Sequence, residues 1–252
     1  MRTARLLVDG RALTAEVAAD GSLLSGGARY DPDAVTFLPP LCPRTVYGLA
    51  LNYADHAAEL ELERPEDPAL FIKARSSLVG HRAAVVYPRG VQYCHYEAEL
   101  AVVIGRPARR VKAKDALRYV GGYTVANDFT CRDFVKNVFR PPVKAKGFDT
   151  FGPLGPYLVS ADEVGNPGSL RVQTRVNGEL RQEGNTRDLI YSVPDIIEYF
   201  SWFLTLEPGD VILTGTPKGI SHVYPGDEMA CEVEGLGQLV NPVVDDPEEV
   251  EG

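Results

Sequence analysis

Long hydrophobic runs are missing from this chain of 252 residues. No stretch of 18 apolar residues occurs, so we expect no membrane-spanning helix. Residues 1–10 contain neither a long apolar core nor a small-residue cleavage site, so we also expect no secretory signal peptide. These absences argue against a helical membrane protein and against a secreted one.

Cysteine is scarce and shows no paired spacing. The four cysteines are Cys42, Cys94, Cys131 and Cys231, and no C-x-x-C motif occurs. This pattern argues against a disulfide framework and against a zinc site. It favours a reducing compartment, and we expect a cytoplasmic protein. Cys94 lies among apolar residues and is expected to act as a small buried hydrophobic side chain.

Positive charge is also in deficit. The chain has 26 lysines and arginines against 35 aspartates and glutamates, which gives a formal net charge of −9 and a pI of about 5.0. Nucleic acids and anionic membranes need basic surfaces, so neither is an expected partner. A small anionic substrate needs only a few local cations and is compatible with this charge.

The remaining composition is that of an ordinary globular protein, with 44% hydrophobic and 24% charged residues. Turn signals at Asp9-Gly10 and Asp20-Gly21, followed by the proline-rich stretch 39–43, predict a small N-terminal β appendage over residues 1–43. Residues 44–252 are expected to form the main domain.

Short apolar or alternating segments predict strands along most of the chain. Expected strands lie at 46–51, 69–73, 98–104, 121–127, 154–160, 170–177, 210–214 and 228–233. Asn177-Gly178 predicts a type I′ hairpin. Helices are expected at 52–62, 112–119 and 192–206, the last with Ser192 as its N-cap. Strands in irregular order with few helices predict an α+β fold that is mostly β.

The segment from Tyr93 to Ile104 alternates between polar and apolar residues, which predicts a strand with two distinct faces. Glu97 and Glu99 share one face, with Cβ atoms about 6–7 Å apart at the usual strand rise. Two carboxylates this close repel each other unless a cation or proton lies between them, and a hard divalent cation prefers oxygen ligands. A third carboxylate, Asp128, follows a later apolar strand. The alternative is a polar strand face turned toward water.

His56 and Glu59 lie three residues apart in the expected helix at 52–62, so they share a helix face. A carboxylate beside a histidine fixes its tautomer and raises its basicity, which suits a general base. The polar, breaker-rich stretch 61–68 that follows suggests a mobile flap. The alternative is a surface helix with an incidental pair.

Three cations could bind an anionic substrate: Lys73, Arg132 and Lys146, each of which is by default a surface residue. A strand also runs into the glycine-rich turn at 213–220, where Gly215 exposes backbone N–H groups beside the hydroxyl of Thr216. Such a turn can hold a carboxylate. It is not a P-loop, because the required spacing of Gly, Lys and Ser/Thr is absent.

Five segments, in this order, make the chain resemble the fumarylacetoacetate hydrolase family over residues 45–245. They are Asn52-Tyr53-Ala54-Asp55-His56, Tyr96-Glu97-Ala98-Glu99-Leu100, Gly122-Tyr123 leading to Asn127-Asp128, Lys146-Gly147-Phe148-Asp149, and Thr214-Gly215-Thr216-Pro217-Lys218-Gly219. The resemblance implies a mixed β-sandwich roll with the small N-terminal β appendage attached.

The same resemblance implies a metal centre and a lid. Mg²⁺ or Mn²⁺ would be held by Glu97, Glu99 and Asp128, with waters completing the shell. His56 and Glu59 would act as an acid/base pair on the lid.

The resemblance also implies how the substrate is held. Lys146 would contact the substrate oxygens, and Gly215 and Thr216 would hold a carboxylate. Lys73 and Arg132 are further substrate-binding candidates.

Within the family, segments 50–53, 95–100, 176–182 and 232–237 resemble bacterial enzymes that decarboxylate and isomerise seven-carbon 2-oxo-dioates. Some of those enzymes fuse two homologous halves, and this chain has the length of one half. A homodimer is expected, or a pairing with a homologous sister chain. The alternatives are a C–C hydrolase of acylpyruvate or fumarylacetoacetate type and a non-catalytic carboxylate-binding module.

Overall fold

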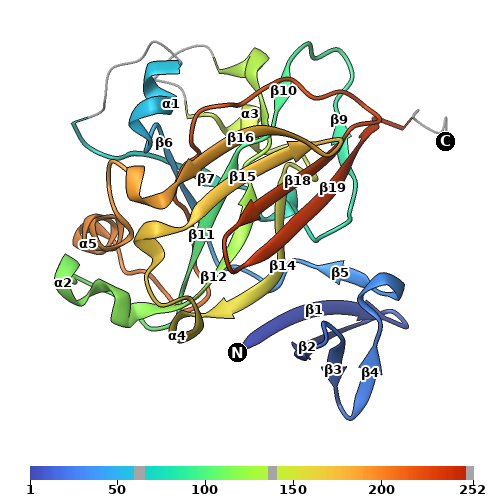
Figure 1. The fold of residues 1–252 in the computed structure, drawn as a ribbon. Helices are drawn as coiled ribbons and strands as arrows, with labels where there is room; N and C mark the ends of the chain where they lie inside the picture. The colour runs from blue at the N-terminus through green and yellow to red at the C-terminus, as the bar shows by residue number, and fades with distance from the viewer. Residues whose placement is uncertain (60–65, 136–140, 248–252) are drawn as a thin grey trace.

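The computed structural model of the protein describes residues 1–59, 66–135 and 141–247, apart from the side chains of residues 56–58 (Figure 1). The strands in the first half of the chain are β1 (Arg2–Val8), β2 (Arg11–Val17), β3 (Leu23–Ser25), β4 (Ala28–Tyr30), β5 (Thr36–Leu38), β6 (Val46–Ala50), β7 (Ala69–Lys73), β8 (Leu78–Val79), β9 (Val85–Tyr87), β10 (Cys94–His95), β11 (Ala98–Ile104) and β12 (Val120–Asn127). The later strands are β13 (Thr130–Cys131), β14 (Gly152–Ser160), β15 (Arg171–Val176), β16 (Glu179–Asn185), β17 (Val211–Leu213), β18 (Glu228–Val233) and β19 (Gly237–Asp245).

Helices are few and mostly short in the described part of the chain. They are α1 (Ala54–Glu59), α2 (Ala113–Ala116), α3 (Val143–Lys146), α4 (Ala161–Val164) and α5 (Val193–Phe203). Single 3₁₀ turns lie at Pro32–Ala34, Arg75–Ser77, Leu117–Tyr119, Arg132–Phe134, Pro167–Ser169 and Thr186–Asp188. The predicted α+β fold that is mostly β is therefore confirmed.

The strands form two main sheets that pack face to face. A 12-stranded mixed sheet has ten strands in the order β4-β3-β2-β1-β14-β12-β11-β17-β6-β7, and its other two strands lie off this path, where β5 pairs with β1 and β8 pairs with β14. A 5-stranded sheet runs β16-β15-β18-β19-β9. Figure 1 shows β15, β18 and β19 in front of β11 and β12. A separate two-stranded ladder joins β10 to β13. This layering explains why so many strands are buried on both faces.

Strand β11 lies at the centre and divides two cores by its period of two. Leu100 and Val102 pack in the larger core with residues of the 5-stranded sheet and of α5. Ala101 and Val103 pack in a second core on the opposite face of the large sheet. Glu99 has the parity of the second face, so its side chain lies on the same side of β11 as Ala101 and Val103. The other residues of β11 are all apolar and buried.

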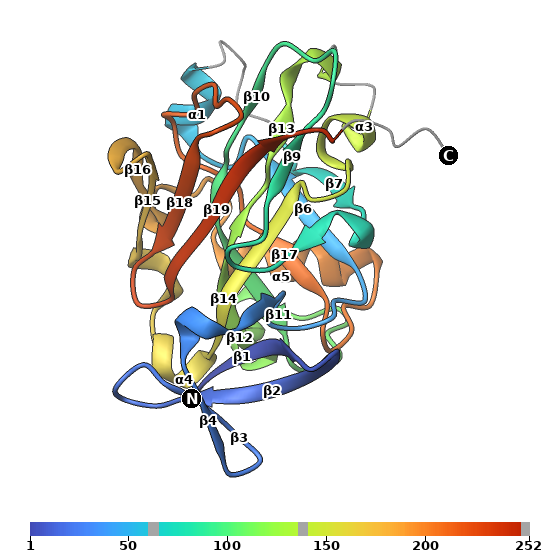
Figure 2. The ribbon, with the colours of Figure 1, turned by 90° about the vertical axis from the view of Figure 1, so that its right-hand side faces the viewer.

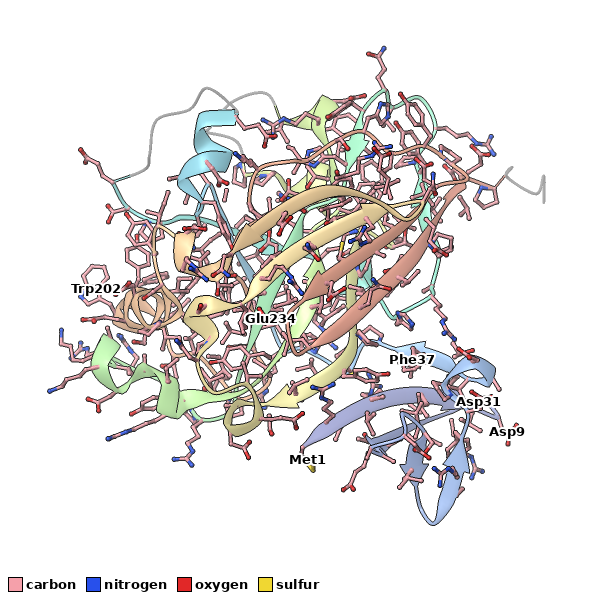
Figure 3. The ribbon with its side chains drawn as sticks, viewed as in Figure 1. Met1, Asp9, Asp31, Phe37, Trp202 and Glu234 are labelled. Atoms are coloured by element: carbon pink, nitrogen blue, oxygen red, sulfur yellow. The ribbon has the colours of Figure 1, made fainter. Side chains whose placement is uncertain are left out.

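Helix α5 begins with the expected capping box. The Ser192 hydroxyl accepts from the Asp195 N–H, and the Asp195 carboxylate accepts from the Ser192 N–H. Ile196 and Phe200 then pack in the larger core, whereas Trp202 projects outward and is 71% exposed (Figure 3). The serine-initiated helix predicted at 192–206 is confirmed, although it ends at Phe203.

Several predicted boundaries move. The strand expected from Tyr93 to Ile104 is divided into β10 and β11, because the chain leaves the β10–β13 ladder before it joins the large sheet. The helix expected at 112–119 is the short α2 followed by a 3₁₀ turn. The last strand, β19, was not among the predicted strands. The hairpin at Asn177-Gly178 is confirmed, with φ of 51° and 82°, both positive as a type I′ turn requires.

The N-terminal strands attach directly to the large sheet. Strand β1 pairs with β14 through Arg2 opposite Val159 and Thr3 opposite Leu158. Figure 2 shows β1 to β4 gathered below the rest of the molecule. Their apolar side chains form a small core of their own around Leu6, Ala15 and Phe37. A division between residues 43 and 44 stays a prediction.

None of the described helices has the length and apolar character needed to cross a membrane.

Candidate active site

Three carboxylates converge from separate parts of the chain. Glu97 lies between β10 and β11, Glu99 lies in β11, and Asp128 follows β12. One carboxylate oxygen of each lies within 4.8 Å of the other two. They are 7%, 1% and 0% exposed. The alternative of a water-facing polar strand is therefore wrong, and the cluster is of a kind that can hold a metal ion.

Backbone hydrogen bonds fix each carboxylate-bearing segment. The Glu97 N–H donates to Asn127 Oδ1 at 2.9 Å, and the Asp128 N–H donates to the Glu97 carbonyl at 2.9 Å. The Gly215 N–H donates to Glu99 Oε2 at 2.6 Å. Gly215 has a φ of 97°, and a Cβ there would lie 2.9 Å from the Asn52 Cβ, so this turn requires glycine.

Two buried lysines neutralise part of this charge. Lys146 Nζ donates to Glu97 Oε2 at 2.9 Å, to Asp128 Oδ2, and to Thr130 Oγ1 at 2.9 Å. Lys73 Nζ donates to Asp128 Oδ1 at 2.6 Å and to the Lys146 carbonyl at 2.7 Å. Lys146, which is predicted to be catalytic, and Lys73, which is predicted to bind substrate, thus both lie in direct contact with the carboxylate cluster.

The two lysines differ in their electrostatics. Burial lowers the pKa of Lys146, but the charges of Asp128 and Glu97 outweigh burial and raise that pKa above its usual value. Burial lowers the pKa of Lys73 despite its pairing with Asp128. Lys146 is therefore a permanent cation and hydrogen-bond donor at neutral pH.

Glu99 is the carboxylate that the lysines leave least compensated. Burial raises the pKa of Glu99 well above its usual value, and the charges of Asp128 and Glu97 raise it further. When all three carboxylates and both ammonium groups are ionised, one negative charge is left uncompensated in a site with almost no solvent access, and a bound cation would balance it. An all-oxygen, anionic and buried donor set fits a hard divalent cation.

His95 is a neighbour of the site that sequence reasoning did not select. Its Nδ1 lies 3.6 Å from Glu97 Oε1 and 3.2 Å from the Tyr96 carbonyl. Burial lowers its pKa to about 4, so the ring is neutral. In the sequence, His95 alternates with Glu97 and Glu99 on the polar face of the expected strand, and this alternation was the available signal. A single histidine in a strand is weak evidence for a functional site.

The glycine-rich turn after β17 lies beside the carboxylate cluster, which it contacts through the Gly215 N–H. The Thr216 hydroxyl donates to the Ala98 carbonyl at 2.9 Å and accepts from Gln182 Nε2 at 2.8 Å. Gln182 also accepts from Thr174 Oγ1 and donates to the Pro217 carbonyl. The buried Gln182 side chain therefore holds the turn at Thr216 and Pro217 by hydrogen bonds. The hairpin pattern in the sequence did not identify this residue.

Helix α1 contacts the same turn. Glu59 Oε1 accepts from the Gly219 N–H at 2.9 Å. The His56 side chain lies outside the described residues, as does the stretch 60–65 expected to form a flap. Arg132 follows β13, and its backbone N–H donates to the Tyr93 carbonyl at 2.8 Å. The positive charge of its side chain contributes to the lowered pKa of His95.

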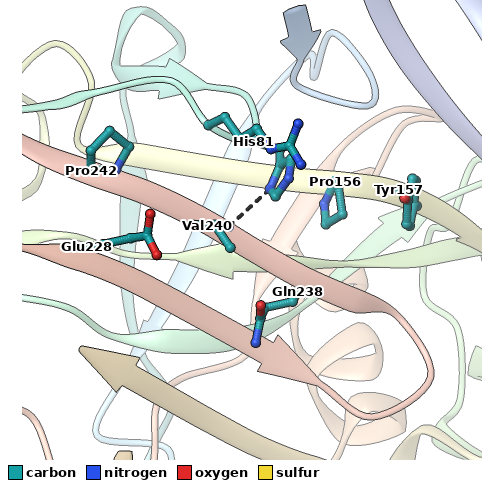
Figure 4. A pocket seen from close by; sticks show the side chains of 8 residues that line it. His81, Pro156, Tyr157, Glu228, Gln238, Val240 and Pro242 are labelled. Atoms are coloured by element: carbon teal, nitrogen blue, oxygen red, sulfur yellow. Dashed lines mark hydrogen bonds between the residues drawn. The ribbon is translucent and has the colours of Figure 1, made fainter. Parts of the chain in front are cut away.

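A separate pocket of about 600 Å³ contains none of these residues (Figure 4). It is lined by His81, Arg82, Pro156, Tyr157, Glu228, Gln238, Val240 and Pro242. His81 Nδ1 accepts from the Val240 N–H at 3.0 Å, and burial lowers the pKa of His81 to about 4. The pocket lies between β14 and β19, apart from the carboxylate cluster.

The fold and the site define a mostly β protein of two packed sheets that bury a cluster of three carboxylates able to hold a metal ion. The family description "Fumarylacetoacetate (FAA) hydrolase C-terminal" matches residues 45–244. The chain belongs to the fumarylacetoacetate hydrolase family.

Individual relatives agree with this assignment. The chain is 51% identical over 210 residues to the 4-hydroxyphenylacetate degradation bifunctional isomerase/decarboxylase of Salmonella dublin. The aligned region covers 83% of this chain and 49% of that protein. The chain thus spans about half the length of that curated relative.

Two solved structures are similar over most of their length. One is 5-carboxymethyl-2-hydroxymuconate delta-isomerase from Mycobacterium smegmatis, with a TM-score of 0.88, 35% identity and coverage of 98% of this chain and 100% of that one. The other is fumarylpyruvate hydrolase from Pseudomonas aeruginosa in complex with Mn²⁺ and pyruvate, with a TM-score of 0.77, 34% identity and coverage of 86% and 94%.

Proposed function

We propose that this chain is a metal-dependent decarboxylase and isomerase of 2-oxo-ene-dioates in 4-hydroxyphenylacetate and homoprotocatechuate catabolism. The observation that carries the proposal is the buried carboxylate cluster within a chain 51% identical to a bifunctional isomerase/decarboxylase of that catabolism. Because the chain spans half of that relative, its activity on its own is part of the proposal.

Glu97, Glu99 and Asp128 are the proposed ligands of Mg²⁺ or Mn²⁺. Such an ion supplies Lewis-acid stabilisation of the negative charge that develops on a 2-oxo acid. The chain's own contribution is to hold the three buried carboxylates together through the Gly215 and Asn127 contacts. Oxygen-only ligation disfavours zinc.

Lys146 and Lys73 have different proposed roles. Lys146 stays protonated, and its three N–H groups already donate to Glu97, Asp128 and Thr130. Its proposed role is to turn one of these N–H groups from a carboxylate to a substrate oxygen when the substrate binds. Lys73 holds the carboxylate of Asp128 and the backbone of Lys146 in place. Lys73 therefore positions the site, and Lys146 acts on the substrate.

The second substrate carboxylate needs a cation or backbone donors, since its desolvation would otherwise go uncompensated. Arg132, half-buried beside Tyr93, is the proposed cation. Gly215 and Thr216 form the proposed wall of this end of the site. Their N–H and hydroxyl groups already donate to Glu99 and to the Ala98 carbonyl, so the proposed contribution of the turn is shape and backbone polarity.

The reaction needs proton movement rather than a nucleophile. When the allylic carboxylate leaves as CO₂, the electrons of the broken C–C bond pass through the double bond to the keto oxygen. Protonation of that oxygen gives a dienol, and isomerisation then moves a proton to carbon 5. We assign this transfer to His56 and Glu59, and the contact between Glu59 and the Gly219 N–H supports a position of α1 against the site.

Replacing His56 by alanine is expected to lower turnover by roughly 10²–10⁴-fold, the usual contribution of a general acid or base. The affinity for Mn²⁺, measured by calorimetry, should change little, because the three proposed ligands are elsewhere. His81→Gln, which alters the separate pocket, is the matched control. An equal loss of Mn²⁺ binding in His56→Ala would mean that the histidine is a ligand or a structural residue.

A rate comparison tests the reaction itself. Purified protein with Mg²⁺ or Mn²⁺ should release CO₂ from 5-carboxymethyl-2-oxo-hex-3-ene-1,7-dioate and consume the dienol absorbance of 2-hydroxyhepta-2,4-diene-1,7-dioate. The alternative reaction is C–C hydrolysis of an acylpyruvate, and the similarity to fumarylpyruvate hydrolase supports testing it. A clearly larger kcat/KM for acetylpyruvate hydrolysis would replace this proposal by the hydrolase.

A further inference from the structure

Two cysteines face each other across the ladder that adjoins the carboxylate cluster. Cys94 in β10 lies directly opposite Cys131 in β13. The next pair along the ladder is Tyr93 and Arg132, and it is hydrogen-bonded, since the Arg132 N–H donates to the Tyr93 carbonyl at 2.8 Å. Antiparallel pairs alternate, so Cys94 and Cys131 form a non-hydrogen-bonded pair with Cα atoms about 4.5 Å apart. That separation lies within the span of a disulfide, roughly 4.4–6.8 Å.

The two thiols are also chemically unequal. The Cys94 thiol donates to the Cys131 sulfur, and this contact lowers the pKa of Cys131 below its ordinary value. The same contact, together with burial, raises the pKa of Cys94. Cys131 is therefore the better nucleophile of the pair, and its partner thiol already lies against it. The other two cysteines are an exposed Cys42 and a buried Cys231 that contacts Thr174 Oγ1 at 3.7 Å.

The position of the pair connects it to the proposed metal ligands. Cys94 precedes Glu97 by three residues, and Cys131 follows Asp128 by three residues. The two segments meet again where the Asp128 N–H donates to the Glu97 carbonyl. A covalent link between the cysteines would join the two segments that carry Glu97 and Asp128.

We propose that Cys94 and Cys131 form a reversible disulfide when the protein meets a small peroxide. The Cys131 thiolate attacks hydrogen peroxide and becomes a sulfenic acid, as the O–O bond breaks and hydroxide leaves. Cys94 sulfur then attacks the Cys131 sulfur, its proton leaves with the departing hydroxyl as water, and the S–S bond forms. Overall, two thiols are oxidised and one peroxide is reduced to two waters, and an external dithiol reverses the step.

Local opening gives the oxidant its route. Both cysteines are buried, so peroxide must reach them when the two-residue strands β10 and β13 separate locally. The covering Tyr87, which contacts Cys94, is itself half-buried and shares a hydrogen bond of 3.0 Å with His222 Nε2. The cysteine pair therefore lies one side chain below the surface.

The experiment uses the full chain with Cys42 replaced by serine, which leaves three of the four cysteines. The protein is treated with hydrogen peroxide in Mg²⁺, alkylated, digested with trypsin without reduction and examined by mass spectrometry. Trypsin cleaves after Arg89, Arg109, Arg118 and Arg132, so the disulfide should join peptide 90–109 to peptide 119–132. Two of three thiols should disappear, and dithiothreitol should restore both.

A second readout is the thermal midpoint. Closing the loop 95–130 restricts the unfolded chain, and we expect the midpoint to rise by roughly 5–10 °C on oxidation. Cys231→Ser should keep the linked peptides and the rise, whereas Cys94→Ser and Cys131→Ala should each lose both. Because the peptide mapping leaves Cys94 and Cys131 intact, misfolding of a variant in this pair does not spoil the test. Unchanged thiols, sulfinic or sulfonic acid at Cys131 without the linked peptides, or a different pairing would overturn the proposal.

Discussion

Replacing Asp128 by asparagine should abolish measurable Mn²⁺ binding and lower the free energy of unfolding by about 3–5 kcal/mol, the usual cost of breaking a buried ion pair. Asp128 is fully buried and accepts from both Lys73 and Lys146. The neutral amide would leave Lys73, which is 2% exposed, without its carboxylate. The same change removes one of the three proposed ligands, so metal-dependent turnover should be lost as well.

Calorimetric titration with Mn²⁺ and urea unfolding measure the two effects separately. Glu183→Gln is the charge-matched control, because it removes one negative charge from an exposed position on β16. It should change the free energy of unfolding by no more than about 0.5 kcal/mol. Wild-type Mn²⁺ affinity in Asp128→Asn would show that the cluster is not the metal site.

Replacing Lys146 by methionine should give the opposite pattern for the metal. Turnover should fall by at least about 10²-fold, because a charged donor beside the reacting oxygens is removed. The affinity for Mn²⁺ should stay the same or increase, since the ammonium group competes with a cation for Glu97 and Asp128. Methionine keeps most of the length and volume of the side chain without its charge.

Lys144→Met is the matched control, because Lys144 lies in the same helix α3 but is exposed and contacts the Phe134 ring. It should retain both turnover and Mn²⁺ affinity. Mn²⁺ binding that weakens in Lys146→Met as strongly as in Asp128→Asn would mean that Lys146 serves to hold the carboxylates rather than to act on the substrate.

The sequence by itself determined the local elements and the family. The period of two in β11, the Asn177-Gly178 hairpin and the Ser192 capping box are encoded by neighbours in the chain, and all three are present. Such signals depend on backbone preference and side-chain alternation over a few residues. The family assignment depended on ordered motifs and is confirmed. The roles of the site residues, the homodimer and the cytoplasmic location stay predictions.

The tertiary structure alone decided what the local signals left open. Whether Glu97 and Glu99 face water or the interior depended on which distant segments pack around them, and the segments that carry Asp128 and Lys146 bury both. The contact of Lys73 with Asp128 spans 55 residues, and the pairing of Cys94 with Cys131 depends on ladder register. No local pattern encodes such contacts, because they exist only once distant strands have packed and excluded the water that would otherwise separate the charges.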